Sequence, residues 1–156
     1  MAPVQADLPG RLAGIDYGSV RIGIAVTDRR QTLASPFENY TRRGLALDAE
    51  YFQRLAREEE IVQFVVGLPI HLDGRESQKS IEAREFGEWL KKSTGVSVDY
   101  FDERFTSVQA QQLLVGAALS RKRRKARLDM LAAQILLTAY LESRSRGSDP
   151  PRGLDD

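Results

Sequence analysis

The amino-acid sequence predicts a single α/β domain on a mixed five-stranded sheet. In this sheet an antiparallel meander of three strands continues into parallel strands, with helices on both faces. Three observations carry the prediction. A chain of 156 residues has about the size of one domain. Its first 40 residues hold three strand-like segments in succession and no helical stripe. From residue 45 onward, helix-like and strand-like segments alternate, as they do in units whose strands are parallel.

The three N-terminal segments each have the pattern of a strand. Residues 12–17 form a short apolar run bounded by glycine, which is typical of a buried strand. Residues 20–27 alternate between apolar and other side chains, which is typical of a strand with one covered face. Residues 32–40 contain Pro36, which cannot donate a ladder hydrogen bond, so we expect this strand at an edge or an end.

The later elements follow from changes in the hydrophobic period. Apolar residues recur every three to four positions in a helix that covers a sheet, whereas a continuous β-branched run is typical of a strand buried on both faces. We expect, in order, a helix over 45–60, a strand over 61–66, a helix over 76–92, a strand over 96–101, a helix over 106–115 and a last helix whose stripe runs from 128 to 140.

Both ends of the chain are polar and lack this periodicity. We expect residues 1–10 to be a flexible tail, residues 11–143 to form the domain, and residues 144–156 to be disordered, because they are rich in Pro, Gly and charge. No segment has the apolar run of a signal peptide or a membrane span. The sequence therefore predicts a cytoplasmic protein without a membrane partner.

The composition narrows the chemistry that is available. The chain has no cysteine, which excludes a disulfide scaffold, a thiol nucleophile and an iron–sulfur cluster. It has one histidine, His71, so a metal centre with several histidines is excluded too. Any bound metal must therefore be held by oxygen ligands, which favours hard ions such as Mg²⁺ or Mn²⁺.

The formal net charge of +1 conceals an uneven distribution. The segment 116–146 holds eight basic and two acidic residues and carries +6, so the rest of the chain carries −5. The local field of a surface, not the net charge of the chain, decides which ligands it attracts. A nearly neutral chain can therefore still bind nucleic acid.

Acidic residues lie at three places where a carboxylate is costly. Asp16 ends the first apolar strand, Asp102 and Glu103 directly follow the strand over 96–101, and Asp129 lies in the first turn of the last helix, beside its apolar stripe. An unpaired charge near a core needs a compensating partner. Divalent cations shared by carboxylates supply one, and hydrolysis of phosphodiesters by two metal ions requires such an arrangement.

Each acid also has a plain structural explanation. Asp16 could form the turn before Gly18, and Asp129 could be an acid favoured by the dipole at the start of a helix. Asp102 and Glu103 could be loop charges ahead of the next helix. The case for a metal site therefore depends on all of these acids meeting at one end of the sheet.

Several residues could bind phosphate groups. Arg21 and Arg104 are candidate clamps, because guanidinium groups bind phosphate oxygens in pairs. Gly18 would let the backbone approach a ligand closely, although hairpin geometry explains it equally well. The densest basic stretch would hold flanking phosphates, unless it is only a solubilising surface loop. It consists of Arg121, Lys122, Arg123, Arg124, Lys125 and Arg127.

Four motifs, in order along the chain, resemble those of the YqgF/RuvX family. They are GIDYG with RIGIA at 14–18 and 21–25, VVGLP with DG at 65–69 and 73–74, DERFTS at 102–107, and DMLAA at 129–133. The resemblance covers most of the chain, from residue 11 to residue 142. Met130 stands where a Lys is common in the family, and this departure touches none of the acids.

The resemblance implies a ribonuclease-H-like fold and a metal-dependent nuclease. Members of the family are linked to maturation of the 5′ end of pre-16S ribosomal RNA, and their similarity to Holliday junction resolvases suggested that they cut four-way DNA junctions. Carried over to this chain, Asp16, Glu103 and Asp129 are the catalytic and metal-binding set for Mg²⁺ or Mn²⁺, and Asp102 is less clearly a ligand. The implied partners are pre-rRNA in the precursor of the small ribosomal subunit, or branched DNA.

Two other classes of function stay open at this point. An Asp-x-Gly after the first strand also occurs in actin-like ATPases, but those proteins need a second lobe that 156 residues cannot supply. A non-catalytic nucleic-acid binder would keep the basic stretch without needing the acids. The sequence also leaves open RNA or DNA as substrate, endonuclease or exonuclease, one metal or two, and monomer or homodimer.

Overall fold

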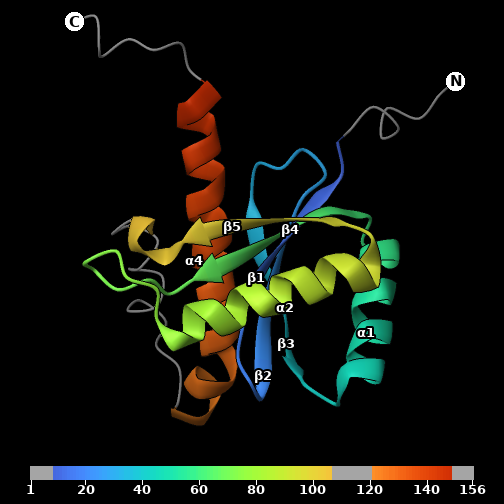
Figure 1. Cartoon of the computed structure of the whole chain (residues 1–156). Helices are drawn as coiled ribbons and strands as arrows, with labels where there is room; N and C mark the ends of the chain where they lie inside the picture. Colours follow the sequence, from blue (N-terminus) through green and yellow to red (C-terminus); the bar gives the residue numbers. More distant parts are fainter. Residues whose placement is uncertain (1–8, 107–120, 149–156) are drawn as a thin grey trace, which may run out of the picture.

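The computed structural model describes residues 9–106 and 121–148, together with their side chains except those of 121–129 and 146–148. These residues form one sheet with helices on both faces (Figure 1). The helix expected over 106–115 falls almost wholly outside the described residues, as do most of the two expected tails.

The sheet has five strands in the order β3-β2-β1-β4-β5. Strands β1 and β2 pair antiparallel, as do β2 and β3, whereas β1 and β4 pair parallel, as do β4 and β5. This is the mixed sheet that the sequence predicts. The strands are β1 (Arg11–Asp16), β2 (Arg21–Thr27), β3 (Ala34–Thr41), β4 (Ile61–Leu68) and β5 (Ser97–Asp102).

Strand β1 lies in the middle of the sheet, and β3 lies at its outer edge, as Pro36 predicts. Because β1, β4 and β5 run in the same direction, their last residues Asp16, Leu68 and Asp102 meet at one edge, which we name the carboxyl edge. Strand β4 is two residues longer than predicted, so that Gly67 lies inside the strand and not in the turn after it.

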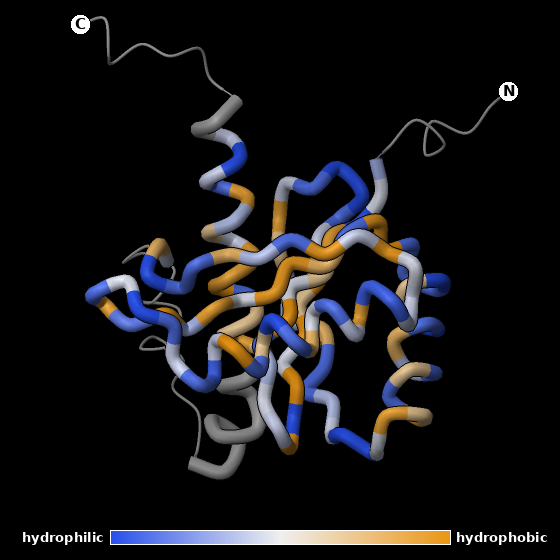
Figure 2. The backbone as a smooth tube through the Cα atoms, viewed as in Figure 1, coloured by the Kyte–Doolittle hydropathy of each residue, from blue (hydrophilic) through white to orange (hydrophobic). Residues whose placement is uncertain are grey.

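Two helices cover one face of the sheet, α1 (Leu45–Glu58) and α2 (Gln78–Thr94) (Figure 1). Aromatic rings form the centre of this core: the Phe52 ring of α1 lies 5.7 Å from that of Phe86 on α2 and 6.3 Å from that of Phe64 on β4. Figure 2 shows the apolar central strands enclosed between the helices.

Within the described chain, a single long helix covers the other face. Helix α4 (Arg121–Ser148) packs on β1, β2, β3 and β4. It comes close to β1 because Gly14 has no side chain: a Cβ there would lie 3.0 Å from both the Ala133 carbonyl oxygen and the Leu137 Cβ. Neither α4 nor any other helix among the described residues is long and apolar enough to cross a membrane.

Helix α4 begins earlier than the sequence predicts. It already includes residues 121–127, so Asp129 is its ninth described residue and does not lie in its first turn. The basic stretch is therefore helical. Arg, Lys and Ala are good helix formers, and no Gly or Pro interrupts them. The apolar stripe starts only at residue 128, which is why the hydrophobic period places the start of the helix too late.

Helix α4 also ends later than predicted. It continues to Ser148, past the expected boundary at residue 143, so residues 144–148 are not part of a disordered tail. Arg144 gives the physical reason. Its guanidinium carbon lies 5.7 Å from the centre of the Tyr140 ring, and its Nη1 donates a hydrogen bond to Gln31 Oε1 at 2.9 Å. The first glycine after residue 140 is Gly147.

Candidate active site

Asp16 is the last residue of β1, at the centre of the carboxyl edge. Side chains alternate between the two faces along a strand. Leu12 belongs to the core under α4, and a Cβ at Gly14 would contact α4, so Asp16 lies on the same face. The ladders on both sides of β1 fix the backbone of this residue, and its side chain is half-buried.

Glu103 reaches the same face from the end of β5. It opens a short 3-10 turn, Glu103–Phe105, and its carboxylate folds back over β4. A Cβ at Gly67 would lie 2.6 Å from Glu103 Oε1 and 3.1 Å from Leu136 Cδ2 of α4. Because Ile15 pairs with Val66, position 67 is next to position 16 in the register. Asp16 and Glu103 therefore converge on the α4 face of the carboxyl edge.

The Glu103 carboxyl group lies in an environment that resists ionisation. Burial raises its pKa above the ordinary value, and the nearby Asp102 carboxylate raises it further. Among the described residues, no cation counters these two effects. A partly buried carboxylate of this kind has a strong tendency to bind either a proton or a metal ion.

The Asp102 carboxylate, unlike that of Glu103, is bound by a neighbouring arginine. Its Oδ1 accepts the backbone N–H of Arg104 at 2.9 Å, which caps the 3-10 turn, and its Oδ2 accepts from the Arg104 Nε at 2.8 Å. These bonds to Arg104 hold the pKa of Asp102 below its ordinary value. Asp102 and Arg104 thus form an ion pair that shapes the turn under Glu103.

Asp129 belongs to α4, the helix that packs on the face of the sheet to which Asp16 belongs. Leu136 of α4 lies near Gly67 of β4, and Tyr140 Oη accepts a hydrogen bond from Gln63 Nε2 at 2.8 Å. Helix α4 therefore runs antiparallel to β4. Earlier residues of α4 therefore approach the carboxyl edge. The backbone of Asp129 is one turn before Ala133, which faces Gly14. Its side chain lies outside the described residues.

The chemistry of these residues suits a hard divalent cation. Carboxylate oxygens are the preferred protein ligands of Mg²⁺ and Mn²⁺. A cation beside Glu103 would compensate the burial and the Asp102 charge that raise the pKa of this group. No cluster of three His, Cys, Asp or Glu side chains able to hold a metal is found within the described ranges, which omit the Asp129 side chain.

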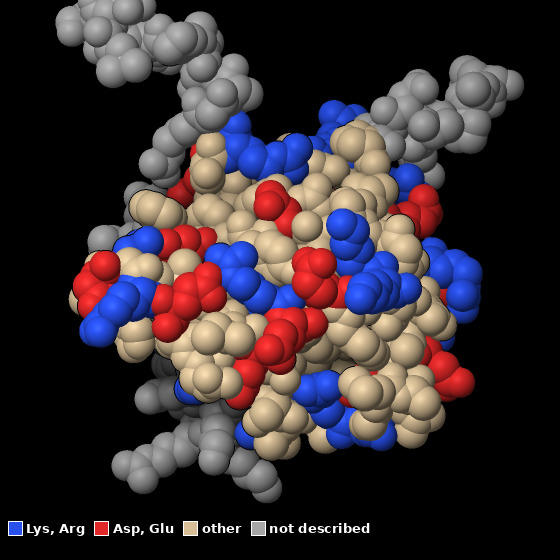
Figure 3. Space-filling model, viewed as in Figure 1, with Lys and Arg blue, Asp and Glu red and all other residues tan. Residues whose placement is uncertain are grey.

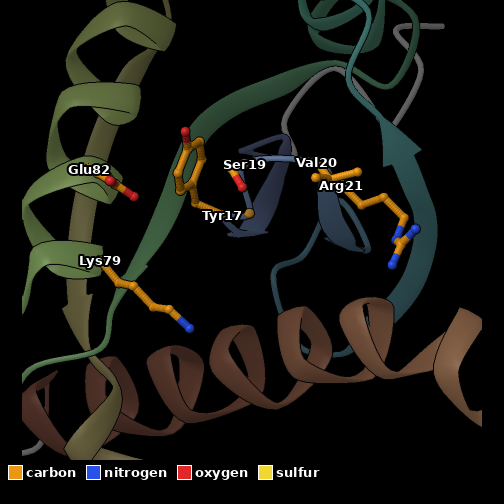
Figure 4. Close-up of a pocket in the computed structure, with 7 residues that line it drawn as sticks. Tyr17, Ser19, Val20, Arg21, Lys79 and Glu82 are labelled. Atoms are coloured by element: carbon orange, nitrogen blue, oxygen red, sulfur yellow. The ribbon is translucent and has the colours of Figure 1, made fainter.

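A polar pocket of about 300 Å³ opens directly after Asp16 (Figure 4). We name it the edge pocket, and it is lined by Tyr17, Gly18, Ser19, Val20, Arg21, Lys79 and Glu82. Two predicted phosphate-binding residues, Gly18 and Arg21, are therefore brought together here. Gly18 is also required by the turn itself, because a Cβ there would overlap the Arg21 carbonyl oxygen.

Sequence reasoning missed two residues of this region. Gly67 reads as a strand terminator, and only the returning Glu103 side chain reveals why a glycine is needed. Lys79 lies on the polar face of α2 and looks in the sequence like any solvated lysine. No local signal distinguishes it, because its position at the pocket depends on the packing of α2 against the sheet.

We expect Gly67→Ala to impair the site more than the fold. The added methyl would overlap Glu103 Oε1 at 2.6 Å, and this flexible side chain can swing away. Binding of Mn²⁺ measured by calorimetry should weaken by about 10-fold or more, and the free energy of unfolding should fall by about 1–3 kcal/mol because Leu136 is crowded too. The control is Gly87→Ala on α2, where the added Cβ would crowd the Tyr100 ring at 2.6 Å and leave Glu103 untouched. This variant should lose stability to a similar degree and keep its affinity for Mn²⁺. Unchanged Mn²⁺ affinity in Gly67→Ala would exclude Glu103 as a ligand.

Solved structures identify the class of this fold. T. thermophilus RuvC in complex with a Holliday junction substrate superposes with a TM-score of 0.56 at 14% sequence identity, over 92% of this chain and 99% of that one. A match at this identity establishes the fold alone. The predicted ribonuclease-H-like fold, shared with the resolvases of this class, is confirmed.

Sequence relatives identify the family. The RuvX family model, described as Holliday junction resolvase, matches residues 10–143. A Rhodopirellula baltica protein named "Putative pre-16S rRNA nuclease" is 49% identical over 148 residues, which are 94% of this chain and 86% of that protein. A Syntrophomonas wolfei protein of the same name is 40% identical over 139 residues, 89% of this chain and 99% of that protein.

The chain belongs to the RuvX family. The predicted nuclease class, an enzyme that hydrolyses phosphodiester bonds in nucleic acid, is thereby confirmed. This membership supports a nuclease over the two alternatives left open by the sequence, an actin-like ATPase and a non-catalytic nucleic-acid binder.

Proposed function

We propose that this protein is a metal-dependent endonuclease that processes the 5′ end of pre-16S ribosomal RNA, in the cytoplasm and within the precursor of the small ribosomal subunit. One observation carries the proposal: Asp16 and Glu103 converge on the α4 face of the carboxyl edge. The names of the relatives that are 49% and 40% identical to this chain support ribosomal RNA as the substrate.

In this proposal Asp16, Glu103 and Asp129 hold Mg²⁺ or Mn²⁺. When bound, the ion activates water and stabilises the charge that develops on the reacting phosphate. The protein fixes the positions of the carboxylates and surrounds them with a medium of low dielectric constant. The ladders on both sides of β1 fix Asp16, and Glu103 is held over Gly67 beneath Leu136. Water is thus partly excluded, which strengthens the attraction between carboxylates and a cation.

The basic residues would bind the nucleic-acid backbone around the cleaved bond. Arg21 and Gly18 line the edge pocket and would contact phosphate there. Arg104 can offer only the N–H groups that its bonds to Asp102 leave available. The basic stretch of α4 directly precedes Asp129 in the helix, which supports a role in holding flanking phosphates.

We expect the triple replacement of Arg123, Arg124 and Lys125 by Ala to weaken binding to every nucleic-acid sequence by a similar factor. Losing three phosphate contacts should flatten the slope of log K against log salt by about 2–3 units. The measurement is a salt titration followed by fluorescence anisotropy. The control triple replaces the exposed Arg54, Arg57 and Lys92 by Ala and should keep the slope. Equal slopes in both triples would show that the basic stretch does not touch phosphate.

A four-way DNA junction is the second candidate substrate. It is supported by the description of the RuvX family and by the fold shared with T. thermophilus RuvC in complex with a Holliday junction. Resolving a junction needs two cuts in opposed strands and therefore two active sites. This candidate requires a homodimer, whereas RNA processing requires only a monomer.

The deciding experiment offers both substrates to the wild-type protein. A labelled RNA spanning the 5′ end of pre-16S rRNA and a synthetic four-way junction are incubated with Mg²⁺, with Mn²⁺ or with EDTA, and the oligomeric state is measured in parallel. We expect metal-dependent cuts inside the RNA. Symmetric cutting of the junction alone, by a dimer, would establish the second candidate. Cleavage of neither substrate would overturn the proposed function.

A further inference from the structure

The edge pocket holds a cation that sequence reasoning did not single out. Lys79 is the second residue of α2 and is exposed. Figure 4 shows its ammonium group directed across the pocket toward α4, while Arg21 extends on the opposite side. Tyr17, Ser19 and Val20 lie between these two cations. The pocket is thus flanked by positive charge from two elements far apart in the sequence.

Lys79 differs from the other basic side chains around it. Arg75 is paired with Asp73, Arg84 with Glu76, and Arg104 with Asp102, each at 2.6 Å or less. In the described part of the chain, Lys79 makes no such ion pair. The face that carries α2 and β5 mixes acidic and basic side chains and offers no continuous basic surface (Figure 3). The ammonium group of Lys79 is therefore available for a ligand of the edge pocket.

The size and the polarity of the pocket fit a nucleotide unit. A volume of about 300 Å³ is at the lower end of the range for small-molecule sites and exceeds the space of a single water by far. Glu82 is the one acidic residue in the lining, against the two cations. Its Oε1 accepts a hydrogen bond from Gln78 Nε2 at 3.5 Å. The Ser19 hydroxyl group adds a donor between the cations.

We propose that the edge pocket binds a phosphodiester group of the substrate strand next to the cleaved bond, and that Lys79 is its principal contact. This inference rests on the proposed function, because the pocket follows Asp16 directly in the chain. A nucleic-acid strand bound in the edge pocket would meet Lys79 on one side and Arg21 on the other. Lys79 acts as a point charge that binds phosphate without reading the base.

The test measures binding separately from cleavage. Lys79→Ala and Lys91→Ala are compared by fluorescence anisotropy with a single-stranded RNA in buffer without divalent metal. Lys91 is exposed and lies about 18 Å further along α2, in its last turn. One lost phosphate contact should flatten the salt slope by about 0.7 and weaken binding by about fivefold at 0.1 M salt. Lys91→Ala should match the wild type, and Glu82→Gln should bind at least as tightly.

The outcomes separate this inference from the proposed function. If the wild type binds and cuts RNA but Lys79→Ala behaves like Lys91→Ala, the edge pocket is not a phosphate site, and the proposed function stands. If the wild type neither binds nor cuts nucleic acid, both fail. Millimolar inorganic phosphate or AMP should not stabilise the protein in a thermal shift. Stabilisation that depends on Lys79, without an effect on RNA binding, would show a site for a free anion and overturn the assignment to a strand.

Discussion

Replacing Asp16 by Asn is expected to slow metal-dependent cleavage strongly and to leave the protein folded. The amide has the shape of the carboxylate, so the two ladders of β1 and the core beneath α4 should persist. It lacks the negative charge that would hold a cation. Metal ions stabilise the transition state of phosphodiester hydrolysis by several kcal/mol, so we expect a loss of about 10²–10³-fold in rate. The measurement is single-turnover cleavage with saturating protein and Mn²⁺.

The matched control for this variant is Asp99→Asn. Asp99 lies on β5, which β4 separates from β1, and away from the carboxyl edge; its Oδ2 accepts a hydrogen bond from Tyr140 Oη at 2.8 Å. This variant loses the same charge and should keep its activity within a few fold. Full activity of Asp16→Asn would remove Asp16 from the catalytic set. A melting temperature that falls only in Asp16→Asn would mean that Asp16 serves the fold.

The largest effect on stability is expected from Asp48→Ala. The Asp48 carboxylate is fully buried at the start of α1. It accepts hydrogen bonds from Tyr40 Oη at 2.6 Å, from the Arg43 backbone N–H at 2.9 Å and from Arg42 Nε at 3.2 Å. Its removal leaves a buried hydroxyl and a mostly buried guanidinium group without their partner. We expect a loss of about 3 kcal/mol, or about 6–12 °C in Tm for a domain of this size.

The control for Asp48→Ala is Asp73→Ala, which breaks an exposed pair with Arg75 at 2.6 Å. A surface ion pair contributes about 0–1 kcal/mol, so denaturant unfolding should separate the two variants clearly. Equal losses of unfolding free energy in the two variants would mean that burial does not determine how strongly the Asp48 contacts stabilise the fold. Because Arg42 Nη1 also donates a hydrogen bond to Tyr17 Oη at 3.0 Å, Asp48→Ala should in addition loosen one wall of the edge pocket.

The same carboxylate gives the stability a dependence on pH. Burial alone would raise the pKa of Asp48, but the hydrogen bonds from Tyr40, Arg43 and Arg42 outweigh it and hold the pKa below the ordinary 3.8. Its contribution is therefore complete above the pKa of the unfolded chain and is lost as the pH falls through the lower pKa of the folded state. The difference in stability between wild type and Asp48→Ala should accordingly narrow below about pH 4.

The sequence predicts the sheet and two of the site residues for a simple physical reason. Strands and their directions follow from hydrophobic period and from the lengths of the connections. An acid at the end of an apolar strand, such as Asp16, must lie at the carboxyl edge of the sheet. The same argument places Asp102 and Glu103 together at this edge. The family resemblance singles out Glu103, and the structure separates the two, because Asp102 is bound by Arg104. The ends of α4 could not be predicted, because the basic stretch and Arg144 extend a helix without extending its apolar stripe.

Asp48 shows where such reasoning fails. It is more deeply buried than Asp16 or Glu103, yet in the sequence it looks like an ordinary acid in the first turn of a helix. Its partners Tyr40 and Arg42 come from β3 and from the connection that follows it, and only tertiary packing brings them together. Costly burial therefore identifies a carboxylate that needs a partner, and the structure decides whether that partner is a side chain or a bound cation.

The position of α4 has a consequence for the order of events during protein synthesis. Asp16 and Glu103 lie on the sheet face that α4 covers, and α4 comes after the five described strands in the chain. A nascent chain that has emerged only as far as β5 can pair its strands and dock α1 and α2. It still exposes the apolar side chains of Leu12, Val65 and Phe101, and it lacks Asp129. Chains truncated before α4 should therefore be inactive and prone to aggregate, so that nuclease activity begins only after α4 has been synthesised.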